Sequence, residues 1–277
     1  MKVGSFEIFE VLDGTFRLDG GAMFGIVPKP LWSRTDPSDE RNRILLALRP
    51  LLVKTNSQNI LIDTGLRSDR DRKFQDIYDM NCGHLPEELE KLDVPADEIN
   101  TVILTHLHFD HSGGVVRARE DGALTCAFPN AKYMIQKAEW EDAHNSNELT
   151  RASYLTEELD VIEAAGQLEL IDGDTQVAPG VRTFVTGGHT RGHQIVMIES
   201  GGETCAYWGD LIPLAAHVNM PYIMAYDLYP VDTLDQKRKW LSRAIAGNWI
   251  CCFEHDPRIG LARLERDEKR ISVKKLA

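Results

Sequence analysis

Short apolar runs bounded by turn-forming residues recur along the chain and predict buried β-strands. Three early runs span residues 6–12, 45–54 and 60–63, and four later runs span 101–104, 181–185, 205–208 and 250–253. Branched and aromatic residues are frequent in these runs, as is typical of strands in a sheet. Candidate ligands follow the ends of the later runs, so we expect them on loops at one edge of a rigid sheet.

Segments with helical features lie between the predicted strands. They span residues 86–92, 137–145, 149–165 and 233–246. The last is expected to begin after Asp232, a good N-cap residue, and to end before Gly247. Strands that alternate with helices predict an α/β fold in which the helices cover sheet faces. Because no linker, low-complexity tract or internal repeat divides the sequence, we expect one domain over residues 1–277.

Composition and charge narrow the range of partners. With 277 residues, 43% of them hydrophobic, the chain can bury a sizeable core. The net charge of −12 argues against nucleic-acid phosphate as a substrate and against docking on anionic membranes, since both need basic surface. Residues 1–10 lack the features of a secretory signal, and no apolar stretch is long enough to span a bilayer. We expect a cytoplasmic protein that acts on a small molecule; a homodimer is compatible with the sequence.

The cysteines show no disulfide framework. There are five, at positions 82, 126, 205, 251 and 252. The adjacent pair lies in a predicted strand, where neighbouring side chains point to opposite faces. We therefore expect buried thiols rather than disulfides or metal ligands.

The densest chemical pattern is HLHFDH at residues 106–111, directly after an apolar run. Neutral imidazole and ionised carboxylate are ligands that suit zinc, iron, cobalt and manganese. His106 and His108 alternate, so in an extended segment they point the same way and can share one ion, whereas Asp110 and His111 lie beyond them where the chain turns. Four such ligands exceed what one tetrahedral ion with an open catalytic position needs. The run therefore predicts two metal ions.

A polar turn in which histidines happen to cluster is the alternative interpretation of this run. Uncompensated burial of so many polar groups is costly, and full exposure leaves their regular spacing unexplained. The metal site is the better interpretation.

The run resembles the signature of the metallo-beta-lactamase-fold hydrolases, His-X-His-X-Asp-His, which is followed along the chain by a histidine, an aspartate and a last histidine. GHTRGH at residues 188–193 is similar to the family's GHTPGH segment, and its second histidine, His193, matches the ligand position. Asp210 and His255 each follow an apolar run and match the remaining two positions. LIDTG at residues 61–65 resembles the family segment whose aspartate, here Asp63, orients the metal ligands without binding the metal itself.

The resemblance implies a four-layer αββα sandwich, the metallo-beta-lactamase fold, and a dinuclear metal centre of the kind found in lactonases, organophosphate hydrolases and glyoxalase II. It places the first metal on His106, His108 and His193 and the second on Asp110, His111 and His255. Asp210 bridges the two metals in this scheme. Zinc is the expected metal, with iron, manganese and cobalt as alternatives.

A mechanism follows from what two cations do to water. A metal lowers the pKa of bound water from about 15.7 to roughly 7, so a bridging hydroxide can act as the nucleophile at neutral pH. One metal would polarise the substrate carbonyl or phosphoryl oxygen, and Asp110 or Asp210 would move the proton to the leaving oxygen. No serine or cysteine nucleophile is required.

Other polar residues have two interpretations each. His189 either orients His193 by a hydrogen bond within the loop or faces solvent. His217 either reaches the substrate or is a satisfied histidine elsewhere. Tyr222 and Tyr226 belong to an aromatic stretch that forms either a substrate wall or ordinary packing.

The substrate is less well defined than the metal chemistry. Acyl-homoserine lactonases of this fold often place a tyrosine a few residues after the bridging aspartate, where this chain has residues 211–213, Leu-Ile-Pro. Tyr222, Tyr226 or Tyr229 could substitute only if their loop folds back. We favour a carboxylic ester or a lactone as the substrate, with a phosphotriester as the alternative. A thiolester hydrolase, a beta-lactamase, a single-iron thiol dioxygenase and a non-catalytic metal-stabilised module fit the sequence less well.

Overall fold

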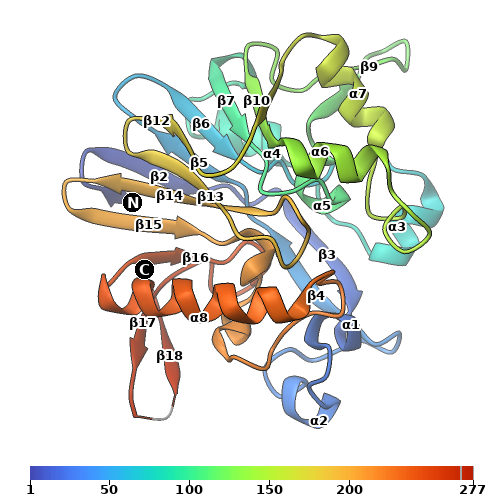
Figure 1. Ribbon diagram of the computed structural model, residues 1–277. Helices are drawn as coiled ribbons and strands as arrows, with labels where there is room; N and C mark the ends of the chain where they lie inside the picture. Colours follow the sequence, from blue (N-terminus) through green and yellow to red (C-terminus); the bar gives the residue numbers. More distant parts are fainter. Residues whose placement is uncertain (269, 277) are drawn as a thin grey trace.

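Among the residues that the structure describes, two seven-stranded mixed sheets pack face to face, with helices on their outer sides (Figure 1). The computed structural model describes residues 1–268 and 270–276. The first sheet has the order β1 (Lys2–Val3), β2 (Phe6–Glu10), β5 (Leu51–Lys54), β6 (Asn59–Ile62), β7 (Ile99–Ile103), β10 (Lys132–Gln136), β11 (Leu168–Ile171). The second has the order β12 (Thr175–Ala178), β13 (Val181–Val185), β14 (Gln194–Ser200), β15 (Glu203–Tyr207), β16 (Ile250–Cys252), β17 (Leu261–Arg266), β18 (Ile271–Lys275).

Smaller elements connect and flank the sheets. Two hairpins stand apart, β3 (Gly14–Asp19) with β4 (Arg43–Leu48) and β8 (Val116–Ala118) with β9 (Leu124–Cys126). The helices are α1 (Gly20–Phe24), α2 (Lys29–Trp32), α3 (Arg72–Tyr78), α4 (Leu85–Glu90), α5 (Phe109–Ser112), α6 (Lys137–His144), α7 (Thr156–Ala164) and α8 (Pro230–Ala246). Short 3-10 turns span Ala96–Glu98, Gly209–Leu211 and Ala215–Val218.

Three apolar layers hold the four-layer arrangement together. Between the sheets, Ile8, Val53 and Ile60 of the first share a core with Val196 and Tyr207 of the second. A second core contains Leu159 and Ile162 of α7 together with Leu61, Val102 and Tyr133 of the first sheet. A third contains Trp240 and Leu241 of α8 together with Ile195 and Met197 of the second sheet. The expected αββα sandwich is confirmed, and Figure 1 places α8 on the side opposite α4, α6 and α7.

Parallel pairing brings distant segments to one edge. β6 and β7 are parallel, so the segments that follow Ile62 and Ile103 emerge side by side. In the second sheet β15 and β16 are parallel, so the segments after Tyr207 and Cys252 also emerge together. The carboxyl ends of parallel strands are common positions for functional groups.

The expected strand over residues 45–54 is interrupted. Arg43–Leu48 pairs with β3 in a separate hairpin, whereas Leu51–Lys54 joins the first sheet between β2 and β6. Pro50, which lies between the two strands, has no backbone N–H to donate, so a continuous ladder is not available here.

Two helix boundaries also differ from expectation. The helix expected over residues 149–165 begins only at Thr156, after turns. The helix expected from residue 233 begins at Pro230, with Tyr229 as its N-cap and Asp232 in its first turn. Proline is favoured in the first turn because its missing N–H has no partner there in any helix. The helix over residues 137–145 is confirmed as Lys137–His144.

The burial of the cysteines agrees with the expectation from the sequence. All five cysteines are buried and none forms a disulfide.

Within the described residues, we find no helix with the length and apolar character that a membrane crossing requires.

Candidate metal centre

The HLHFDH segment is held at the ends of two neighbouring strands of the first sheet, β6 and β7. It leaves β7 and turns into α5, and Thr64, just after β6, donates its backbone N–H (2.8 Å) and its hydroxyl (2.9 Å) to the carbonyl of His111. The next turn needs glycine, because a Cβ on Gly114 would lie 2.2 Å from the Thr64 carbonyl oxygen. Close backbone contact therefore holds the segment rigidly at the sheet edge.

One cluster of ligand atoms comprises His106, His108, His189 and Asp210, all within 4.8 Å of one another. His108 Nδ1 and His189 Nε2 lie 3.0 Å apart. Asp210 Oδ2 lies 3.2 Å from His189 Nε2 and 3.9 Å from His106 Nε2. Three imidazoles and one carboxylate oxygen thus face a common point.

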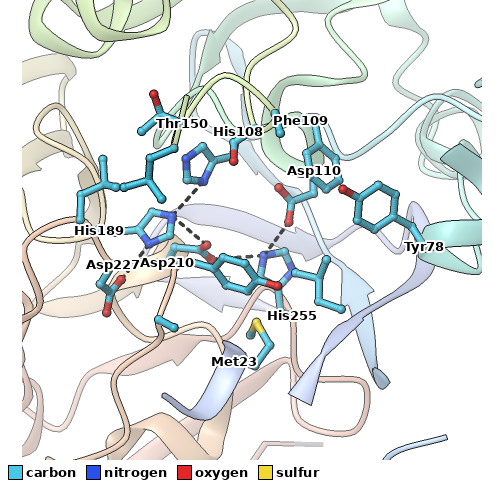
Figure 2. A pocket seen from close by; sticks show the side chains of 17 residues that line it. Met23, Tyr78, His108, Phe109, Asp110, Thr150, His189, Asp210, Asp227 and His255 are labelled. Atoms are coloured by element: carbon cyan, nitrogen blue, oxygen red, sulfur yellow. Dashed lines mark hydrogen bonds and ion pairs between the residues drawn. The ribbon is translucent and has the colours of Figure 1, made fainter. Parts of the chain in front are cut away.

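A second cluster comprises Asp110, His111 and His255. The Nε2 atoms of the two histidines are 3.1 Å apart, and Asp110 Oδ2 lies 3.6 Å from His255 Nε2. The other oxygen of Asp210, Oδ1, lies 3.2 Å from His255 Nε2 and 3.5 Å from His111 Nε2. Asp210 therefore directs one oxygen to each cluster, and Figure 2 shows it between His189 and His255.

The assignment of His193 to the first metal is wrong. Its Nδ1 donates to Thr186 Oγ1 (2.6 Å), and its Nε2 accepts the backbone N–H of Asp210 (3.0 Å). Both ring nitrogens are thus used within the protein. The first histidine of GHTRGH, His189, takes the place beside His106 and His108.

His189 is held in this orientation by the segment that precedes α8. Its Nδ1 donates to Asp227 Oδ1 (2.8 Å), so the Nε2 lone pair faces the cluster. The backbone N–H groups of Leu228 and Tyr229 donate to the carbonyls of His189 (3.0 Å) and Gly188 (2.7 Å). The sequence offers no local signal for Asp227, which lies 38 residues away.

Polar groups behind the second cluster fix its ligands. Asp63 accepts from the Thr105 N–H and hydroxyl, both at 2.7 Å, and from His111 Nδ1 at 3.0 Å, which agrees with the orienting role expected of it. Glu254 Oε2 lies 2.9 Å from the same His111 nitrogen, a contact that the sequence analysis missed. His255 Nδ1 donates to a backbone carbonyl (2.9 Å), which leaves its Nε2 for the cluster.

The donor atoms fit divalent cations. His106 Nε2 and Asp210 Oδ1 are buried and have no hydrogen-bond partner among the described residues. Burial lowers the pKa of His106 and His108 well below the ordinary value, so both are neutral imidazoles, the form that binds metals. Although burial opposes ionisation, His111, His189 and His255 hold the pKa of Asp210 well below its usual range. The set therefore suits two cations that share Asp210.

A cavity of about 480 Å³ opens onto both clusters. Its remaining walls are largely apolar or aromatic and include Leu18, Met23, Tyr78, Phe109, Leu149, Ala152, Tyr226 and Leu228. Tyr226, in the segment that precedes α8, also lines the cavity. Tyr78, which the sequence analysis missed, comes from the end of α3, and Figure 2 shows its side chain beside Asp110.

His217 and Tyr222 do not line this cavity; they support its wall. His217 donates from Nε2 to the Met23 carbonyl (2.8 Å) and stacks on Phe24, with ring centroids 5.1 Å apart. Tyr222 packs edge-on against the same phenylalanine at 5.7 Å. Lys237 of α8 is fully buried and donates to the carbonyl of Tyr222 (2.6 Å). These contacts fasten the cavity wall to α1 and α8.

Known proteins are similar to this chain in sequence and in fold. The sequence model of the metallo-beta-lactamase superfamily matches residues 50–255 of this chain. An N-acyl homoserine lactonase from a Bacillus species is 33% identical over 160 residues, 54% of this chain and 57% of the relative. One from Bacillus thuringiensis is 34% identical over 160 residues, with the same shares. The matched part of this chain thus spans a little over half the length of these curated relatives.

Solved structures match over a greater length. A probable metal-dependent hydrolase from Staphylococcus aureus is 30% identical, with a TM-score of 0.92 over 100% of this chain and 99% of that chain. AidC, a dizinc quorum-quenching lactonase, is 22% identical, with a TM-score of 0.79 over 100% of this chain and 96% of that chain. At 22% identity, the match to AidC shows only that the two proteins share a fold.

Proposed function

The chain belongs to the metallo-beta-lactamase superfamily, and from this premise we propose that it is a metal-dependent hydrolase that opens lactones. The observation that carries the proposal is Asp210, which directs its two oxygens to separate ligand clusters at the base of a largely apolar cavity. The lactonases among its relatives support the choice of substrate class.

The residues proposed to hold the cations are His106, His108 and His189 in the first cluster and Asp110, His111 and His255 in the second, with Asp210 shared. Two divalent cations bound there would supply Lewis acidity at the reacting oxygens and lower the pKa of water. Zinc is the metal we propose, because it accepts this mixture of imidazole and carboxylate ligands.

The side chains at the cavity floor have separate tasks in this proposal. Asp110 and Asp210 both line the cavity, and either one would carry the proton toward the leaving oxygen. Burial raises the pKa of both Tyr78 and Tyr226, and the charge of Asp110 adds to the rise. Both phenols therefore stay protonated and can donate a hydrogen bond to a substrate oxygen.

The cavity wall favours a lactone with an apolar substituent. Met23, Phe109 and Leu228 offer apolar surface beside the clusters, and burying a substituent against it is favourable at about 25 cal/mol per Å². N-acyl homoserine lactones, the substrates named for the Bacillus relatives, have this form and are the first compounds to test.

A screen of substrates tests the reaction class. We expect zinc-reconstituted protein to hydrolyse N-acyl homoserine lactones with a higher kcat/KM than aryl esters, thiolesters or phosphotriesters assayed side by side. Rates are followed by proton release for the lactones and by chromophore release for the others. A phosphotriester turned over faster than every lactone would contradict the proposal, as would activity that survives complete removal of metal.

Metal content tests the dinuclear site. We expect about two ions per chain, because seven donor residues suit two open-sided sites better than one closed site. Elemental analysis after reconstitution and mild dialysis measures this number. A value of one or less with zinc, manganese, cobalt and iron alike would rule out the dinuclear proposal, and oxygen consumption with iron alone would instead indicate a dioxygenase.

A further inference from the structure

Helix α6 carries a buried carboxylate that is outside both ligand clusters. Glu139 lies in the first turn of the helix, immediately after β10, and only 1% of its surface is exposed. Removing a carboxylate from water is costly unless hydrogen bonds compensate for it. The hydrogen-bond partners of Glu139 therefore indicate the role of this buried carboxylate.

Those partners belong to the two loops that form the first cluster. One oxygen, Oε1, accepts the backbone N–H of Leu107 (3.1 Å), the residue between His106 and His108. The other, Oε2, accepts the hydroxyl of Thr190 (2.5 Å), the residue after His189. A single carboxylate thus connects two loops that are more than 80 residues apart in the sequence.

Packing around Glu139 makes the connection close. A Cβ on Gly192 would lie 2.4 Å from the Glu139 backbone nitrogen, so the GHTRGH turn rests directly on the start of α6. The Tyr154 hydroxyl also reaches Glu139 Oε1 (3.4 Å), and the backbone of Tyr154 pairs with His108. The HLHFDH loop is thus tied to α6 both directly and through Tyr154.

We propose that Glu139 is a positioning residue that sets the distance between the His106/His108 pair and His189, and so the affinity of the first cluster for its cation. It touches neither the cation position nor the cavity, and it acts through Leu107 and Thr190. The inference rests on the proposed metal-dependent function only in that cations bind to these clusters. Residues that orient metal ligands typically change metal affinity 10- to 100-fold when they are replaced.

The test measures cation retention rather than turnover. Zinc-loaded parent, Glu139→Ala, Glu139→Gln and Thr190→Val are dialysed against increasing chelator, and zinc per chain is determined at each concentration. We expect Glu139→Ala and Thr190→Val to lose one zinc at a chelator concentration about 10- to 100-fold lower than the parent, while the other zinc is held as before. Glu139→Gln should be less affected, because its amide keeps an acceptor for Leu107 and offers a donor to Thr190.

A matched control separates positioning from general packing. Thr183 of β13 is fully buried, and its hydroxyl has no partner among the described residues, so Thr183→Val repeats the Thr190 change where no such contact exists. We expect Thr183→Val to follow the parent's chelator profile. Because Glu139 and Thr190 act as a pair, Glu139→Ala combined with Thr190→Val should be no worse than the more severe single change.

Three results would overturn the inference. They are a parent-like chelator profile in folded Thr190→Val, an equal shift in Thr183→Val, and a parent that binds no zinc. Should Glu139→Ala fail to fold, which thermal unfolding monitored by circular dichroism detects, Thr190→Val decides the question. A parent that holds two zinc ions but hydrolyses no lactone would contradict the proposed function alone, since the chelator profiles still test Glu139.

Discussion

Replacing Asp210 with Asn is expected to lower the hydrolytic rate at least about a hundredfold, the scale of losing one well-placed electrostatic group. The amide keeps the shape of the side chain but removes the negative charge that faces both clusters through Oδ1 and Oδ2. The fold should survive, because Asp210 lies in a short turn after β15, at the sheet edge.

The measurement is turnover and metal content for Asp210→Asn on the best substrate from the screen. Cys251→Ala serves as the control, because Cys251 is buried beneath α8 and takes no part in either cluster. It should lower the free energy of unfolding by about 1 kcal/mol through lost packing and leave two ions bound. Near-parent activity with two ions in Asp210→Asn would show that this residue does not bridge the clusters.

Replacing the two histidines of the GHTRGH turn one at a time should affect metal content and hydrolytic rate in opposite ways. His189→Ala removes a ring nitrogen aimed at the first cluster, so we expect about one ion fewer per chain and a rate at least about a hundredfold lower. In His193→Gln the side-chain oxygen can still accept the Asp210 N–H, so both ions should remain and the rate should fall tenfold or less. The main effect of His193→Gln should be a free energy of unfolding about 1–3 kcal/mol lower than the parent's, because buried hydrogen bonds are disturbed.

Metal content and thermal unfolding of the two variants, prepared in parallel, provide the measurement. Retention of both ions in His189→Ala together with the loss of one in His193→Gln would restore the ligand assignment made from the family pattern. Equal loss in both variants would mean that the turn is required only as a whole.

Local sequence pattern was sufficient for the features that depend on neighbouring residues. HLHFDH places three imidazoles and a carboxylate within six positions, and the apolar runs before Asp210 and His255 mark buried strands that end beside them. Any fold that buries these runs in parallel pairs brings the residues after them to one edge. For this reason an α/β fold with a metal site at one sheet edge could be predicted from the pattern, whereas the αββα architecture and the full ligand set came from the resemblance to the metallo-beta-lactamase-fold hydrolases.

The features that could not be predicted depend on contacts between distant segments. His189 and His193 are four positions apart in a glycine-rich turn, and only their partners, Asp227 for one and Thr186 for the other, decide which ring faces the cluster. Tyr78 enters the cavity from α3, a short helix in which no residue is buried. No spacing rule connects such residues to the motif they serve.

The parallel pairing of β15 with β16 also has a consequence for how the site assembles during folding. Between these strands the chain leaves the sheet, builds the cavity wall and α8, and then returns. Closing a crossover of this length requires chain entropy to be lost before the new contacts compensate, so such pairings form slowly. His106, His108 and Asp110 are neighbours from the moment they are synthesised, whereas His255 arrives only when this crossover has docked. We therefore expect the second cluster to be completed late in folding, so that a chain arrested before this step would not present the paired site.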